Sequence, residues 1–183
     1  MILFFVIFVI LLADFASGVV HWAEDTFWTE STPVLGKWIV SPNVLHHRDG
    51  GAFVSNSWLQ SSWDLLLGSL LIVVGAWLTG VLSWQVWLFV LVGANANQIH
   101  KWSHMKDSDI PVPIRFLQHC HVLQSRSHHG AHHRDQKNSS YCVVTPLVNP
   151  VLDALGFWRA LERLLVPRFG APRRTDLLMR LKI

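Results

Sequence analysis

Basic residues are missing from two long parts of this 183-residue chain. No Lys or Arg occurs before Lys37, and none occurs between Arg48 and Lys101. All 15 basic residues behind the formal net charge of +3 lie in the remaining parts, where they do not line a helix that could read bases. This distribution argues against a nucleic-acid-binding protein.

Cysteines and nucleotide-binding motifs are also scarce. The two cysteines, Cys120 and Cys142, are too few for a disulfide framework, and we expect both to be free thiols. The chain has no glycine-rich phosphate loop, no nucleophile elbow, no dinucleotide fingerprint and no internal repeat. It therefore lacks the signatures of nucleotide-dependent enzymes and of α/β-hydrolases.

Apolar residues are abundant. They make up 51% of the chain, the mean hydropathy is positive, and ten Trp stand against one Tyr. These features predict an all-α integral membrane protein that forms a single domain over residues 1–183. We expect about three transmembrane helices, at about residues 2–22, 63–78 and 83–100, with Trp58 and Trp63 as anchors at the membrane interface.

The first of these segments has no basic residues before its apolar core, so we expect a retained helix and not a signal peptide. It should continue through His21 to Asp25, which places these two residues on one face. Asp14 within it either has a functional role or marks the end of the span. Short amphipathic helices are expected at the interface, over residues 114–123 and about 150–166.

The short connection after residue 78 makes the second and third apolar runs antiparallel. Every His, Lys and Arg then falls on one side of the membrane. By the positive-inside rule this is the cytoplasmic face, and it carries a His-rich region at residues 100–134. A basic tail follows, which either meets anionic headgroups or is solvated; it contains Arg168, Arg173, Arg174, Arg180 and Lys182.

Histidines recur at helical spacing. His100 and His104 are four residues apart, as are His128 and His132, and His129 and His133, so each pair shares a helix face. Neutral imidazole is a common ligand of iron, zinc, copper and nickel, and the lack of nearby thiolates argues against a structural zinc site. The sequence therefore predicts a metal site.

The His46-His47 doublet and His21 extend this set. His119 and His121 do not, because a spacing of two turns them apart on a helix. The nine remaining histidines suffice for two ions, whereas one hydrolytic zinc needs three protein ligands. The predicted ligands are His21, His46, His47, His100, His104, His128, His129, His132 and His133. Two irons with an open position for dioxygen fit best, because such a centre can attack an unactivated lipid C–H bond, although the same imidazoles also accept zinc or copper.

Several motifs together resemble the Kua family of membrane lipid desaturases, also called the plasmanylethanolamine desaturase family. They are DFASG at 14–18 with HWAEDT at 21–26, HH at 46–47, NQIHKWSH at 97–104, and HHGAHH at 128–133 followed by Tyr141-Cys142. The resemblance covers nearly the whole chain. It implies a di-iron, oxygen-dependent desaturase, which in the ether-lipid branch forms the vinyl ether of plasmalogens from an alkyl ether phospholipid and in the plastid branch desaturates an acyl chain.

The resemblance also implies an external electron donor, cytochrome b5 or a ferredoxin, with the basic tail as one docking surface. It assigns the nine histidines as ligands and no catalytic residue beyond them. Asp25 is either a further ligand or an acceptor that orients His21, and Asn97 and Gln98 would support the ligands.

Other functions stay open at this stage. A di-iron lipid hydroxylase would use the same ligands and differ only after the first hydrogen abstraction. A non-catalytic membrane metal-binding or signalling protein would bind metal without lipid turnover, and a membrane metallohydrolase would need zinc alone.

Overall fold

The computed structural model describes residues 1–134 and 138–169, which form helices and, within these ranges, no strand. In chain order the helices are α1 (Ile2–Thr26), the π-helix η1 (Gly36–Val40), α2 (Ser41–Arg48), α3 (Gly50–Ser55), α4 (Trp58–Leu78), α5 (Trp84–Ala94), α6 (Ala96–His104), the 3-10 helix η2 (Asp107–Asp109), α7 (Val112–His119), α8 (Arg126–Arg134), α9 (Val148–Ala154) and α10 (Phe157–Phe169).

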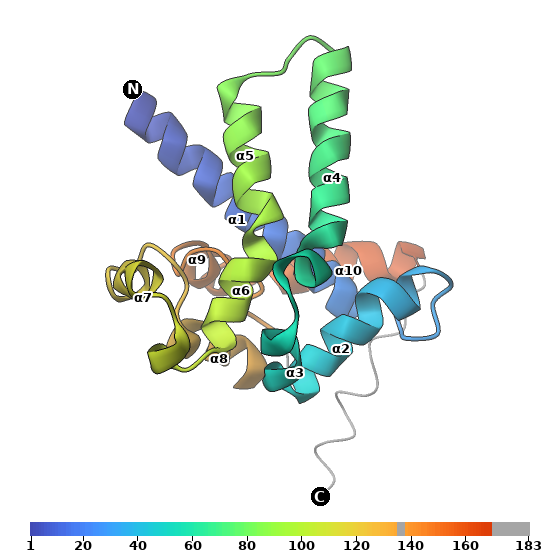
Figure 1. The fold of residues 1–183 in the computed structure, drawn as a ribbon. Coiled ribbons are helices and arrows are strands. Elements are labelled where there is room, and N and C mark those ends of the chain that lie inside the picture. Colours follow the sequence, from blue (N-terminus) through green and yellow to red (C-terminus); the bar gives the residue numbers. More distant parts are fainter. Residues whose placement is uncertain (135–137, 170–183) are drawn as a thin grey trace, which may run out of the picture.

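Three apolar helices project from a broader body of short helices (Figure 1). α5 packs against both α1 and α4, and the tight connection at residues 79–83 makes α4 and α5 antiparallel, as predicted. α4 begins earlier than the apolar run suggests. Ser57 and Gln60 form a capping box that starts this helix at Trp58 instead of residue 63.

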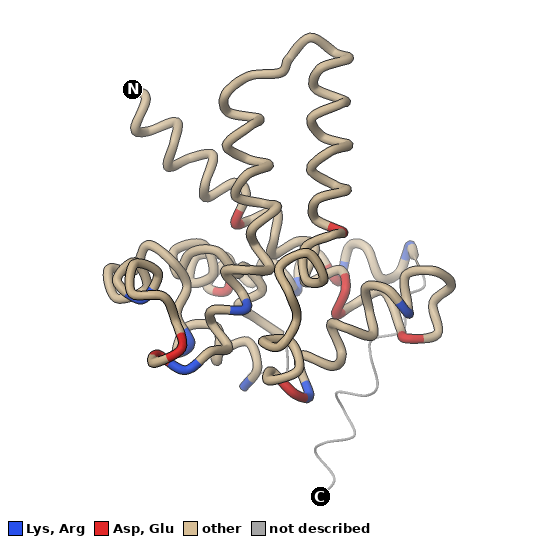
Figure 2. The backbone as a smooth tube through the Cα atoms, in the orientation of Figure 1, with Lys and Arg blue, Asp and Glu red and all other residues tan. Residues whose placement is uncertain are grey.

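Two helices, α1 and α4, are long and apolar enough to cross a membrane. In the most apolar 18-residue stretch of each helix, only 22% of α1 and 11% of α4 is buried in the protein. The core helix of a water-soluble domain would be mostly buried, so these helices expose apolar surface that suits lipid. Lys and Arg lie in the body, away from the projecting ends of the helices (Figure 2).

The third predicted span does not form one helix over residues 83–100. α5 ends at Ala94, and α6 begins after a break at Asn95. The Asn95 side chain donates to the Leu91 carbonyl oxygen and accepts from Trp58 Nε1, so it competes with the helical pattern at this point. α5 alone has 11 residues, a length of about 17 Å, against about 30 Å for the hydrocarbon core of a bilayer.

Asp14 has a structural role. Its carboxylate is fully buried and accepts hydrogen bonds from the backbone N–H groups of Val144 and Thr145 and from the Thr145 hydroxyl. It thereby ties α1 to the irregular segment before α9. Next to this tie, Trp22, Tyr141, Cys142 and Trp158 form a buried cluster.

The single amphipathic helix predicted at about 150–166 is instead two helices, α9 and α10. Gly156 separates them with a φ of +60°, a left-handed conformation that favours glycine. Both cysteines are free, as expected, with Cys120 exposed and Cys142 buried. The basic tail beyond Phe169 lies outside the described residues.

Candidate metal centre

Eight histidines and one carboxylate gather into two adjacent groups, within each of which all ligand atoms lie within 4.8 Å of one another. The five-histidine group contains His46, His100, His104, His129 and His133, and the Asp25 group contains His21, Asp25, His47 and His132. The groups touch: the ring centroids of His47 and His133 are 4.7 Å apart. Segments far apart in the sequence therefore meet at one place.

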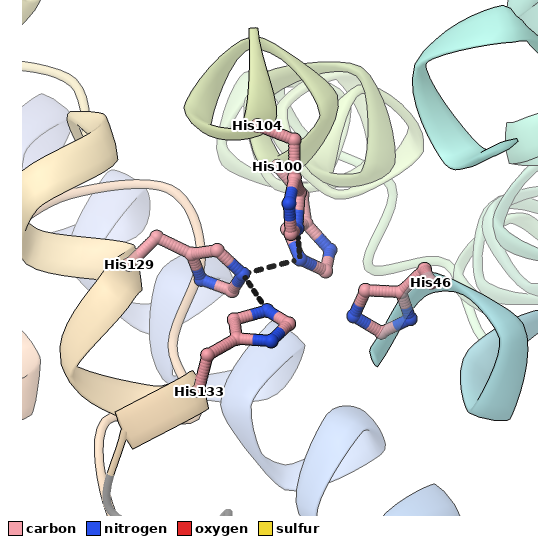
Figure 3. A group of neighbouring side chains, drawn as sticks. All are labelled: His46, His100, His104, His129 and His133. Carbon is pink, nitrogen blue, oxygen red and sulfur yellow. Dashed lines mark hydrogen bonds between the residues drawn. The ribbon is translucent and has the colours of Figure 1, made fainter. Parts of the chain in front are cut away.

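Four helices supply these side chains. α6 contributes His100 and His104 from consecutive turns to the five-histidine group, shown in Figure 3. α1 contributes His21 and Asp25 to the other group in the same way. α2 and α8 each serve both groups, because consecutive residues on a helix point about 100° apart.

Imidazole nitrogens converge in the five-histidine group. His129 Nε2 lies 2.8 Å from His100 Nε2 and 2.9 Å from His133 Nε2, and His100 Nε2 lies 3.2 Å from His104 Nε2 (Figure 3). Nitrogens about 2.1 Å from one ion would be separated by about 3 Å when they are adjacent ligands. The observed spacings match the edges of such a coordination shell.

Burial keeps these rings neutral. It lowers the pKa of His46 and of His129 well below the usual range, and neighbouring histidines lower both further. The pKa of His104 falls to about 4, through burial first and then through the charges of His132 and Arg126. Neutral imidazole is the form that binds metal, so the pocket holds its histidines ready as ligands.

His46 provides an independent indication of a missing partner. Its side chain is buried, and its Nε2 has no hydrogen-bond partner among the described residues. A buried polar nitrogen without a partner is costly. A cation shared with the converging nitrogens would satisfy it, so the residues present fit a metal ion.

In the Asp25 group, one carboxylate oxygen faces three imidazoles. Asp25 Oδ2 lies 3.4 Å from Nε2 of both His47 and His132 and 3.9 Å from Nε2 of His21. The other oxygen, Oδ1, accepts a hydrogen bond of 2.8 Å from Asn43 Nδ2. This amide fixes the carboxylate with Oδ2 directed at the histidines.

Backbone carbonyls orient two of these rings. His21 Nδ1 donates to the carbonyl oxygen of Tyr141 at 3.1 Å, and His132 Nδ1 donates to that of Ser139 at 2.7 Å, in the tautomer whose Nε2 lone pair can bind a metal ion. The Tyr141 carbonyl oxygen thus orients His21 through Nδ1, and Asp25 Oδ2 lies 3.9 Å from the other ring nitrogen, Nε2. Asp25 stands among the candidate ligands.

His128 is the one predicted ligand that the structure does not bring to either group. Its Nδ1 lies 2.8 Å from the Ser125 hydroxyl, and its ring packs against His121 at 5.5 Å. Helical spacing alone would pair His128 with His132, but His132 is turned toward Asp25. His119 and His121 also lie outside both groups.

Among the described residues, neither Asn97 nor Gln98 forms a hydrogen bond to a ligand side chain. Asn97 donates instead to the Ser61 carbonyl oxygen at 2.5 Å and so ties α6 to α4. Gln98 is half-buried and belongs to neither group. Asn43 performs a supporting role that we did not predict, and its position three residues before the His46-His47 doublet, on the same helix, is the only sequence signal for it.

Two cavities reach the histidines. The first, about 450 Å³, is bounded by α1, α2, α4 and α6 and meets His21, His46 and His100. The second, about 980 Å³, is bounded by α2, α3, α6 and α8 and meets His47, His104, His129 and His133 among others. The groups are thus accessible from the side of the apolar helices and from the side of the polar body.

Apolar helices next to paired, histidine-rich groups define the class: a helical protein whose histidine-rich groups could hold metal ions. The sequence profile of the lipid desaturase domain matches residues 10–176. The chain belongs to the lipid desaturase family. Together with the two apolar helices, this membership indicates a membrane protein.

Individual relatives agree with this assignment. Plasmanylethanolamine desaturase 1 of Mus musculus is 34% identical over 91% of this chain and 65% of its own length. Plasmanylethanolamine desaturase of Myxococcus xanthus is 36% identical over 91% of this chain and 62% of its own length. The chloroplastic fatty acid desaturase 4-like 2 of Arabidopsis thaliana is 33% identical over 90% of this chain and 60% of its own length. The chain thus spans less than two thirds of these relatives' length, and no solved structure matches it.

Proposed function

We propose that this protein is an oxygen-dependent di-iron lipid desaturase. The observation that carries the proposal is the pair of adjacent histidine-rich groups in a chain of the lipid desaturase family. The proposed ligands are His21, Asp25, His47 and His132 for one iron and His46, His100, His104, His129 and His133 for the other. His128 is left out.

The donor set suits iron. Imidazole and carboxylate ligands without thiolates are typical of oxygen-activating iron sites, although zinc and copper also accept imidazole. Two bound irons would supply the oxidising power, with dioxygen as co-substrate, to remove two hydrogens from neighbouring carbons of a lipid chain.

The protein's own residues provide position and surroundings. Carbonyl oxygens of Tyr141 and Ser139 hold two rings in place, and Asn43 holds the Asp25 carboxylate. The cavity beside α4 leads from the apolar helices to His21 and His100, which gives a lipid chain a path to the site. Electrons would come from a separate donor of the cytochrome b5 or ferredoxin type.

We propose an alkyl ether phospholipid as substrate and a vinyl ether as product, because the Mus musculus and Myxococcus xanthus relatives are named plasmanylethanolamine desaturases. The name of the Arabidopsis thaliana relative supports an acyl chain as the alternative. We further propose that α5, continued by the start of α6, makes a third membrane passage. By the positive-inside rule, the distribution of basic residues then supports a cytoplasmic face for the site.

Lipid mass spectrometry tests the activity. Membranes that contain the protein, a reductant system and dioxygen should yield ether phospholipids that have lost two hydrogens and have become acid-labile, as vinyl ethers are. Gain of one oxygen would instead indicate a hydroxylase, and an acid-stable loss of two hydrogens an acyl desaturase.

The variant His129→Ala should abolish conversion and lower bound iron, because His129 Nε2 lies within 2.9 Å of two other ligand nitrogens. His121→Ala is the matched control and should stay active, since His121 lies in neither group. Full activity of His129→Ala would contradict the ligand assignment. Bound metal without any lipid conversion in the wild type would favour a metal-binding or signalling protein.

A further inference from the structure

An aromatic ring that has no metal-binding atom packs against the five-histidine group. The ring centroid of Phe53 lies 5.1 Å from that of His100, 5.4 Å from that of His46 and 5.8 Å from that of His104. Phe53 belongs to α3, which packs against both α2 and α6. Because a phenyl ring offers no ligand atom, its contact with three proposed ligands needs an explanation other than metal binding.

The boundary between the two cavities runs along this ring. Phe53 lines the first cavity, of about 450 Å³, and not the second. Of the histidines that it contacts, His100 lines the first cavity, His104 lines the second, and His46 lines both. Gly50, at the start of α3, lines the second cavity. α3 therefore stands between the cavities and turns Phe53 toward the first.

Hydrogen bonds hold both ends of α3 in place. At its start, the Asp49 side chain accepts from the backbone N–H of Gly51 at 2.9 Å. After its end, Lys101 Nζ donates to the carbonyl oxygen of Asn56 at 2.6 Å, and Lys101 is buried, which is rare for a lysine. Lys101 belongs to α6, the helix that supplies two of the proposed ligands. A helix of six residues is not stable alone, so these contacts fix Phe53 against the histidines.

We infer that Phe53 is a barrier that keeps water of the second cavity out of the first. In the proposed function the first cavity gives a lipid chain its path to the histidines, whereas the second lies on the side of the polar body. An apolar ring at the boundary forms no hydrogen bond with water, and moving it out of its packing exposes apolar surface at a cost. Lipid and water thus reach the histidines from opposite sides of one side chain.

This inference rests on the proposed function for the reaction that the barrier protects. In that reaction one dioxygen accepts two hydrogens from the lipid, together with two electrons from the donor and two protons, and two waters form. If water reached the lipid side, dioxygen could instead accept two electrons from the donor and two protons and leave as hydrogen peroxide, with the lipid unchanged. Exclusion of water prevents such side reactions. Phe53 would therefore couple the use of dioxygen to lipid oxidation.

Thiol labelling of the metal-free protein tests the barrier without turnover. Val143 lines the first cavity and not the second, so Val143→Cys in a Cys120→Ser background places a reporter thiol there, while Cys142 is fully buried. The full chain is held in lipid nanodiscs, and a trimethylammonium methanethiosulfonate reagent is added in water. Phe53→Ala should raise the labelling rate by about tenfold, since moving a packed Phe ring into water costs about the free energy that corresponds to this factor. Phe53→Leu keeps an apolar side chain and should label nearly as slowly as wild type.

The stoichiometry of the loaded enzyme distinguishes a barrier from a merely structural role. Wild type should consume one dioxygen for each double bond formed. Phe53→Ala should consume more, with the excess recovered as hydrogen peroxide, and it should bind as much iron as wild type because no ligand atom is lost. Phe53→Leu should restore most of the coupling.

Val54→Ala is the matched control, because Val54 belongs to the same helix and lines neither cavity. This variant should label and consume dioxygen like wild type. Equal labelling rates with and without Phe53→Ala, or loss of iron from Phe53→Ala, would overturn the inference. If Phe53→Ala speeds labelling but wild type forms no unsaturated lipid, the desaturase proposal fails while the barrier stands.

Discussion

Replacing Asp14 by alanine should destabilise the protein by an amount that the structure allows us to work out. Asp14 Oδ1 accepts from Val144 N at 2.8 Å, and Oδ2 accepts from Thr145 N at 3.0 Å and from Thr145 Oγ1 at 2.7 Å. The carboxylate is 0% exposed, so water cannot replace it without a rearrangement. Two backbone donors would be left unpaired, at a cost of about 1–3 kcal/mol each. We therefore expect a loss of about 4 kcal/mol in the free energy of unfolding.

The same substitution should also affect the metal site. The segment that Asp14 holds begins next to Tyr141, whose carbonyl oxygen orients His21. Loss of such an orienting contact typically lowers metal affinity by about 10-fold to 100-fold. Asp14→Asn keeps one acceptor oxygen and similar volume, so it should lose roughly half as much stability.

Denaturant unfolding of the full chain in detergent micelles measures the first effect, and titration with Fe(II) measures the second. Asp109→Ala is the control, because this exposed aspartate should change stability by less than about 0.5 kcal/mol. If Asp14→Ala unfolded within about 0.5 kcal/mol of wild type, the reasoning about its buried hydrogen bonds would be refuted.

Three further outcomes are expected. Metal analysis of His132→Ala should show loss of about one of two bound ions, whereas His128→Ala should keep both, and equal losses would contradict the sorting of these two residues. Gly50→Ala should weaken metal binding by roughly tenfold, because its new Cβ would lie 2.7 Å from His104 Nδ1 and displace that ring; unchanged iron affinity would show that the ring can move away. The metal-free protein should lose about 1.4 kcal/mol of stability per pH unit for each of His46 and His104 as pH falls below about 6.5. Both have a lowered pKa in the folded state, His104 to about 4, so the unfolded chain takes up protons first; unfolding at pH values between about 5 and 8 would check this slope.

Helical periodicity predicted two histidine pairs that the structure brings together in one group. His100 with His104, and His129 with His133, share a face at a spacing of four, and each pair does enter one group. The spacing could not show which face of α8 meets which group. His128 and His132 share a face too, yet only His132 reaches a group, whereas His128 contacts Ser125 and His121.

Local breaks and backbone partners were the parts that periodicity could not predict. Asn95 interrupts the third apolar run through side-chain hydrogen bonds to Leu91 and Trp58, one of which depends on a neighbour 37 residues away. Gly156 divides the last helix through a backbone conformation that most residues avoid. Backbone carbonyl oxygens orient His21 and His132. Because every residue type has such an oxygen, the sequence could not indicate which residues would supply them.

The two histidine-rich groups cannot move independently. α2 supplies His46 to one group and His47 to the other, and α8 divides His133 and His132 in the same way. Because consecutive residues are rigidly linked in a helix, a shift of either helix changes the geometry of both groups together. The proposed di-iron reaction would need its two ions at a fixed separation. A backbone that supplies both groups from the same two helices provides such a separation without any covalent bridge between them.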